Sequence, residues 1–104
     1  MVTTVLAQLA KKEIDFKGVL AFIDQHYTHD PIPFTNGSLR NAATENQGSA
    51  TIFSFARQQG LGKEETLQLF AEHYQAVLDE PEGNNHQNIR QFMIHGWEGI
   101  VLGA

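Results

Sequence analysis

The stretch from Glu64 to Trp97 constrains the fold of this chain most strongly. Apolar residues recur at helical spacing from Leu67 to Leu78, and a second helical stripe runs from Ile89 to Met93. Between these stripes the segment PEGNN combines residues that end one helix with residues that begin the next. The sequence therefore predicts two helices that meet at a corner, with the rest of the chain packed around them.

The totals favour a single small domain that spans residues 1–104. The chain has 104 residues, of which 41% are hydrophobic, and it contains no apolar run long enough to cross a bilayer. Its net charge of −5 argues against binding to nucleic acid or to an anionic membrane surface. The absence of cysteine excludes disulfides, thiolate zinc sites and a cysteine nucleophile. We expect a soluble protein of the cytoplasm, with a monomer favoured.

Polar residues that suit helix N-caps precede three further apolar stripes outside this stretch. These candidate caps are Thr3 or Thr4, Asp15 and Ser49. The helices that they begin are predicted to end near Lys12, before Pro31 and near Gly60. Within the stretch itself the predicted helix boundaries are Lys63 and Pro81, then Asn84 or Asn85 and Gly96.

Residues 28–48 have no helical period and contain the tight-turn signal Asn36-Gly37. Short apolar flanks on both sides of this turn make a small hairpin feasible, and the tail from Gly99 to Leu102 is a candidate strand that pairs with it. We therefore predict a mainly α fold. It is a compact bundle of about five short helices with a small β-hairpin or strand pair.

Three polar side chains near the corner are the most specific candidates for a functional site. Helical spacing places Glu72 opposite the apolar stripe, which predicts a solvated carboxylate, and His73 on the flank of that stripe. His86 precedes the next helix and is explained either by turn chemistry or by an approach to His73 across the corner. In the second case Glu72 or Glu82 would complete a metal or acid–base site. The chain has no HExxH motif, so we predict no metal site, no catalytic set and no cofactor.

Other polar residues also have both a structural and a functional interpretation. Arg90 is expected to form an ion pair with Glu45 or with a carboxylate of the preceding helix, or else to contact a carboxylate or phosphate group. Asn36, Asn41 and Asn46 are expected to stabilise turns, and as an alternative to line a polar pocket.

Several separated segments resemble the HopJ type III effector family. They are PFTNGSL, ENQGSATIFSFA, EETLQLFAEHYQAVL and PEGNNHQNIRQFMIHGWEGI, in this order along the chain. The resemblance implies a small, mainly helical domain and the possibility of type III secretion into a host cell, without implying a catalytic set. It adds Asn88 and Trp97 to the candidate binding residues Glu72, His73, His86, Arg90, Asn36 and Asn46.

Two functional hypotheses follow. The first is a non-catalytic module that interacts with a protein partner, and the alternative is a small enzyme or metal-binding protein that uses the histidine, glutamate and arginine side chains at the corner. A first helix that begins within a few residues of Met1 leaves no flexible leader, which favours a cytoplasmic location in the producing cell.

Overall fold

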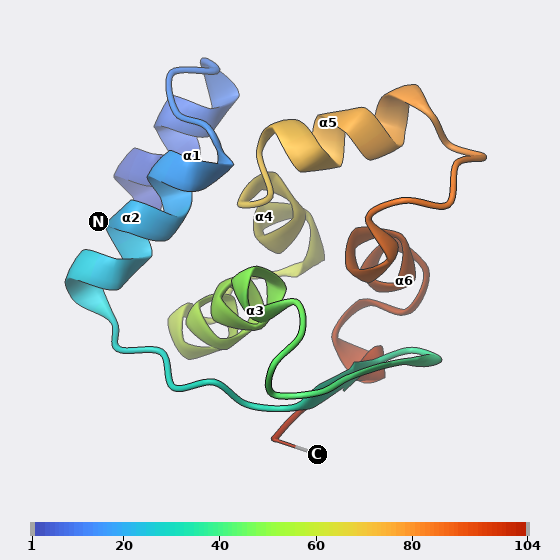
Figure 1. Ribbon diagram of the computed structural model, residues 1–104. Coiled ribbons are helices and arrows are strands. Elements are labelled where there is room, and N and C mark those ends of the chain that lie inside the picture. Colours follow the sequence, from blue (N-terminus) through green and yellow to red (C-terminus); the bar gives the residue numbers. More distant parts are fainter. Residues whose placement is uncertain (1, 104) are drawn as a thin grey trace.

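The helices lie on one side of a small sheet that forms one edge of the computed structural model, which describes residues 2–103 (Figure 1). The helices are α1 (Val2–Ala10), α2 (Phe16–His26), α3 (Gln47–Gln59), α4 (Lys63–Gln68), α5 (Glu72–Asp79), α6 (Gln87–His95) and the 3-10 helix η1 (Gly96–Gly99). The strands are β1 (Phe34–Asn36), β2 (Leu39–Asn41) and β3 (Ile100–Leu102). The predicted fold class, mainly α with a small β component, is confirmed. No helix in residues 2–103 has the length and hydropathy needed to span a bilayer.

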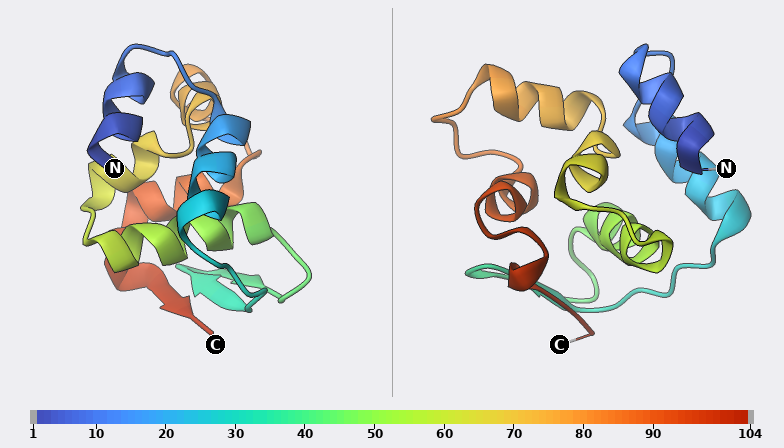
Figure 2. Two further views of the ribbon diagram at one scale, coloured as in Figure 1. Left: turned by 90° about the vertical axis from the view of Figure 1, so that its left-hand side faces the viewer. Right: turned by 180° about the vertical axis from the view of Figure 1, so that it is seen from behind.

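The centre of the molecule is α3, which lies between α2 and α6 in opposite views (Figures 1 and 2). Phe53 on this helix is fully buried and its ring contacts four other aromatic rings. The distances between ring centroids are 6.0 Å to Phe34, 5.5 Å to Phe70, 5.0 Å to Phe92 and 6.2 Å to Trp97. These partners come from the sheet and from both halves of the corner, so one aromatic cluster ties the N-terminal and C-terminal parts together.

The predicted hairpin and its C-terminal partner are both present. β1 pairs antiparallel with β2 on one side and with β3 on the other. The tight turn consists of Gly37 and Ser38, one residue later than the predicted Asn36-Gly37. Gly37 has a φ of 60°, the conformation that the first position of this turn requires. Its amide also donates to Gly99 O at 2.9 Å, which extends the contact with the C-terminal tail.

The predicted single helix from Lys63 to Pro81 is wrong, because two helices occupy this segment. α4 ends at Gln68, and Ala71 has a φ of 52°, which a continuous α-helix cannot contain. Leu67 and Leu69 are both buried, although residues two apart lie on nearly opposite faces of one helix. The break lets both side chains enter the core. It also changes the direction of α5, where Leu78, predicted to lie in the stripe, is 46% exposed.

Several predicted caps are wrong and others are confirmed. Thr3 and Thr4 lie inside α1, Ser49 lies in the first turn of α3, and Asn84 and Asn85 precede the real cap. The N-caps of α3 and α6 are instead Asn46 and His86, both in the left-handed conformation. Asp15 does cap α2 by accepting from Gly18 N at 2.8 Å, and Gly60 ends α3 with a φ of 71°.

Candidate functional site

A cavity of about 390 Å³ opens where α2, α3 and α6 approach the start of α5, and we call it the corner pocket. Its apolar walls are Phe16, Leu39, Phe70 and Ile89. Its polar groups are Asn46, Ser49, His73, His86, Gln87 and Asn88. Gly48 completes the lining at the start of α3. Four of the sequence-predicted site residues, namely Asn46, His73, His86 and Asn88, therefore come together here.

His73 and His86 meet across the corner, as one of the two sequence interpretations required. Their ring centroids are 4.9 Å apart and the ring planes are inclined by 37°. The ring of Phe16 packs edge-on against His73 with a centroid distance of 4.8 Å. His86 reaches this position because its backbone is left-handed, with φ 51° and ψ 49°. The cap of α6 thus projects its imidazole toward α5.

The surroundings of His86 favour its neutral form. Burial lowers its pKa below the usual value, and the nearby imidazole of His73 and guanidinium of Arg90 lower the pKa further. Two positive charges on these adjacent rings would repel each other. The pair is therefore suited to hold one proton more readily than two.

An asparagine network underlies the corner pocket and joins the sheet to α3 and α6. Asn36 Nδ2 donates to Asn88 O at 2.7 Å and to Asn88 Oδ1 at 3.0 Å. Asn88 Nδ2 donates to Asn41 Oδ1 at 3.0 Å, and Asn46 Nδ2 donates to the same oxygen at 2.7 Å. Asn36, Asn41 and Asn88 are buried, so these bonds fix the position of the two amides that line the cavity.

Asn41 is the member of this network that is absent from the candidate binding residues, although it had the same two interpretations from the sequence as Asn36 and Asn46. It accepts from two other asparagines and lies in β2, opposite Phe34 of β1. Its signal in the sequence is weak, because an asparagine in a loop-like segment is explained equally well by turn chemistry.

Glu72 does not belong to the corner pocket. Its side chain is exposed, as predicted, but it is not a free solvated carboxylate, because Oε1 accepts from Phe16 N at 2.7 Å. The amide of Phe16 is one of the unpaired donors in the first turn of α2. Glu72 therefore serves α2 as a second cap, supplied from a distant segment.

Arg90 has a structural role in place of the predicted ion pair. It donates from Nε to Asn85 O at 2.6 Å, from Nη2 to Asn85 Oδ1 at 2.7 Å and from Nη1 to Pro81 O at 3.2 Å. Glu45, the predicted partner, instead accepts from Ala42 N at 3.0 Å. The planar guanidinium of Arg90 places its donors close to oxygen atoms of the α5–α6 loop. It therefore binds this loop instead of forming the predicted ion pair with Glu45.

Trp97 lies outside the corner pocket and belongs to the aromatic core. Its ring is 5.2 Å from that of Phe92, and Nε1 donates to Leu61 O at 2.9 Å. The guanidinium carbon of Arg57 lies 5.0 Å from the centroid of the Trp97 ring. Through these contacts Trp97 connects α3, the α3–α4 connection and η1, which is a structural role.

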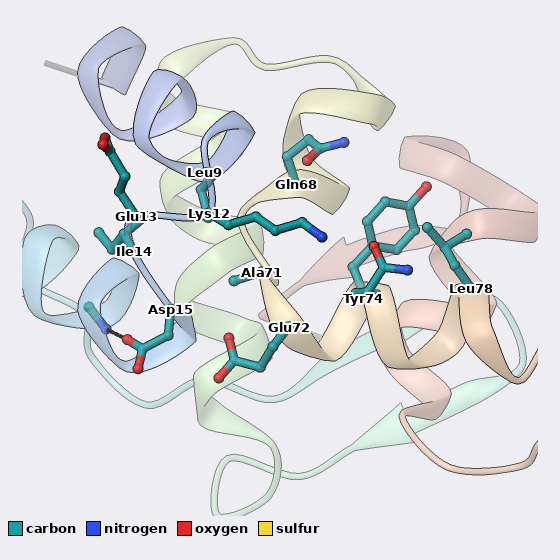
Figure 3. A pocket seen from close by; sticks show the side chains of 12 residues that line it. Leu9, Lys12, Glu13, Ile14, Asp15, Gln68, Ala71, Glu72, Tyr74 and Leu78 are labelled. Carbon is teal, nitrogen blue, oxygen red and sulfur yellow. Dashed lines mark hydrogen bonds between the residues drawn. The ribbon is translucent and has the colours of Figure 1, made fainter.

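A larger hollow of about 790 Å³, which we call the α1–α5 groove, is lined by residues from the end of α1 to the start of α2 and from the end of α4 to α5 (Figure 3). Lys12 extends across it toward Gln68 and Tyr74, and Glu72 and Asp15 lie at its opposite end. Both carboxylates already accept hydrogen bonds from amides at the start of α2. Burial, with a smaller contribution from Glu64, raises the pKa of Tyr74. Among residues 2–103 no set of three or more histidine, aspartate and glutamate side chains is arranged to hold a metal ion.

Comparisons with known proteins place the chain in a family without assigning an activity. Over its whole length it resembles a crystal structure of VPA0580, a protein of unknown function, with 43% sequence identity and a TM-score of 0.89. The match covers 100% of this chain and 89% of the other. No curated protein matches. A family model described as HopJ type III effector protein matches residues 2–104, so this chain belongs to the HopJ family.

Proposed function

We propose that this chain is a non-catalytic protein-interaction module that receives a polar group of its partner in the corner pocket. The observation that carries this proposal is the lining of the pocket. None of its lining residues within the described chain is an Asp, Glu, Lys or Arg. The groups that it offers are amides, a hydroxyl and two imidazoles, which suit recognition by hydrogen bonds.

The dimensions of the pocket agree with this role. A volume of about 390 Å³ lies at the lower end of the range for small-molecule sites and accommodates one or two side chains. Phe16, Leu39 and Ile89 provide apolar walls around the polar groups. A partner side chain could therefore bury its stem against these walls while its polar end replaces water at the amides and imidazoles.

The polar groups are also held in place before binding. The asparagine network fixes the amides of Asn46 and Asn88, and Phe16 packs against the ring of His73. Side chains that are already ordered lose little conformational entropy on association, which leaves more of the contact energy available for affinity.

The alternative, a metal-binding protein or small enzyme, is favoured by one observation, which is the 4.9 Å approach of His73 and His86. The other members of the proposed cluster are engaged elsewhere, because Glu72 caps α2 and Arg90 binds the α5–α6 loop. Titration with Zn²⁺ while the histidine ring resonances are recorded tests this alternative. Saturable shifts confined to His73 and His86 would favour a metal site over a purely protein-binding role.

The partner is to be sought in the cell that produces the protein and, because of the family to which the chain belongs, in host-cell extract. The tagged full chain is compared with two variants. Ser49→Phe places a ring in the corner pocket, and Thr3→Phe places the same ring on the exposed side of α1. The proposal requires a partner that the wild type and Thr3→Phe retain and Ser49→Phe loses. Equal retention by both variants would exclude the corner pocket as the binding site.

A further inference from the structure

We propose that the corner pocket binds a single carboxylate group of the partner, with one proton shared by His73 and His86 as its counter-charge. This inference rests on the proposed function and names the chemistry that the same pocket recognises. The histidine pair carries it, because two adjacent imidazoles in a cavity without acidic residues have no internal group to balance their positive charge.

The free protein leaves both imidazoles available to a ligand. Within residues 2–103 no hydrogen bond joins either ring to another protein group, and the ring contacts are those of His73 with Phe16 and with His86. Each imidazolium would donate N–H bonds, and a carboxylate is an acceptor with lone pairs on both oxygens. Such charge-assisted bonds are among the stronger ones in proteins.

Charge balance selects a monoanion. The mutual repulsion of His73 and His86, together with Arg90 nearby, allows the pair to take one proton more easily than two. Arg90 is bound to Asn85 and Pro81 and does not line the cavity, so the charge that a ligand meets directly is the proton on the pair, which matches a carboxylate better than a phosphate dianion.

Neighbouring charges do not supply the missing anion. The charged side chains next to the lining residues in the sequence are Asp15 before α2, Lys17 on α2, Arg40 on β2, Glu45 before α3, Glu72 on α5 and Arg90 on α6. Of the acidic ones, Asp15, Glu45 and Glu72 accept hydrogen bonds from Gly18 N, Ala42 N and Phe16 N, and none lines the pocket.

Two helix starts add positive potential at the cavity. The first turns of α3 and α6 both contribute lining residues, and neither Asn46 nor His86 caps its helix with a side-chain hydrogen bond. Amides of these turns are therefore left for a ligand, and the positive ends of both helix dipoles lie at the cavity.

The test uses N-acetylglycinate, which carries one carboxylate, and N-acetylglycinamide, its neutral counterpart. Ring resonances of the five histidines of the full chain are recorded against pH with each compound. The carboxylate should shift the ring resonances of His73 and His86 and leave those of His26, His29 and His95 unchanged. Its affinity should fall by up to about tenfold per pH unit once the pair is neutral in the free protein. His86→Gln and His73→Gln should each weaken this pH dependence while the far-ultraviolet circular dichroism is retained.

Three other outcomes of this titration would overturn the inference, and each would point to a different cause. Equal binding of the amide would exclude a carboxylate while leaving the corner pocket as a binding site. Tighter binding of inorganic phosphate at pH 7.5 would exclude the monoanion, and equal shifts at all five histidines would indicate a salt effect only. Loss of the Ser49→Phe effect on partner capture, in contrast, would refute the proposed function itself.

Discussion

The carboxylate of Glu72 and the backbone amide of Phe16 form a 2.7 Å hydrogen bond between the first turns of two helices that are 56 residues apart in the sequence. The same two segments place Phe16 against His73, with the ring of Phe70 stacked 5.9 Å from that of Phe16. The bond therefore sets the distance between α2 and α5 at one edge of the corner pocket.

Glu72→Ala should lower the free energy of unfolding by about 0.5–1.5 kcal/mol, the usual effect of losing a helix cap. Glu72→Gln keeps an acceptor oxygen and should lose less. Glu13→Ala is the matched control, since this exposed glutamate has no side-chain hydrogen bond among the described residues. Urea denaturation measures all three variants. Equal stabilities for Glu72→Ala and Glu13→Ala would mean that the bond to Phe16 contributes nothing in solution.

Gly37→Ala should destabilise the protein more than Gly60→Ala. Both glycines have left-handed backbones, with φ of 60° and 71°, so each alanine incurs a conformational cost of about 1–2 kcal/mol. A Cβ at Gly37 would in addition meet Gln91 Oε1 and His95 Cδ2, whereas nothing lies within 4 Å of one at Gly60. Gln91 Oε1 ends a flexible side chain and His95 is exposed, so both can move aside, and the extra loss should stay below about 1 kcal/mol. Thermal melting of the two variants side by side provides the comparison, and a smaller loss at Gly37 would contradict the packing of the turn against α6.

Gly48→Ala should stabilise the protein by about 0.5–1 kcal/mol, because alanine restricts the unfolded chain and suits a helix better than glycine. The new Cβ would lie 3.6 Å from two ring atoms of Phe16 and 3.9 Å from Leu20 Cδ1, which are ordinary contact distances. Denaturant midpoints of the wild type and the variant test this. A destabilised Gly48→Ala protein would show that α2 packs more tightly on α3 than these distances allow.

Asn88→Ala should destabilise by about 1–3 kcal/mol, because buried amides of the network would lose their partners. Asn41 Oδ1 would lose the bond from Asn88 Nδ2, and Asn41 Nδ2 would lose its 3.3 Å bond to Asn88 Oδ1. Gln87→Ala, at the preceding exposed position, should change stability far less. If the two variants have equal denaturation midpoints, the asparagine network is not a stabilising element.

Stability should fall as the pH is lowered through the ordinary histidine range, in part because of His86. Its pKa is lowered in the folded protein, so the unfolded chain takes up the proton first and is favoured below about pH 6.5. Above that pH the residue is neutral in both states and contributes no slope. His86→Gln should therefore flatten the dependence of unfolding free energy on pH between about 5 and 7. An unchanged slope in the variant would show that His86 has the same pKa in both states.

Local patterns were sufficient for part of this architecture. Asp15 and Gly60 are recognisable as helix ends because their own side chain or backbone freedom determines the role. The turn at Gly37, one residue from its predicted place, and the pairing of the tail with the hairpin follow from glycine placement and from short apolar segments. The approach of His73 to His86 was one of two interpretations, since it depends only on two helices meeting at a short loop.

The remaining features depend on contacts that the sequence does not reveal. The break at Ala71 reflects the burial of both Leu67 and Leu69, which only the packed core requires. His86, not Asn84 or Asn85, begins α6, because Arg90 holds the preceding loop through Asn85 and Pro81. The partner of Glu72 is 56 residues away, beyond the reach of any helical pattern.

The most direct test of the corner pocket as the recognition site is a map of backbone amide shifts in the full chain during titration with N-acetylglycinate at pH 6.5. The prediction is a saturable set of shifts centred on Gly48, Ser49 and Asn88, absent in Ser49→Phe and retained in Thr3→Phe. Shifts centred on Lys12 and Tyr74 in the α1–α5 groove, or shifts that persist in Ser49→Phe, would contradict it.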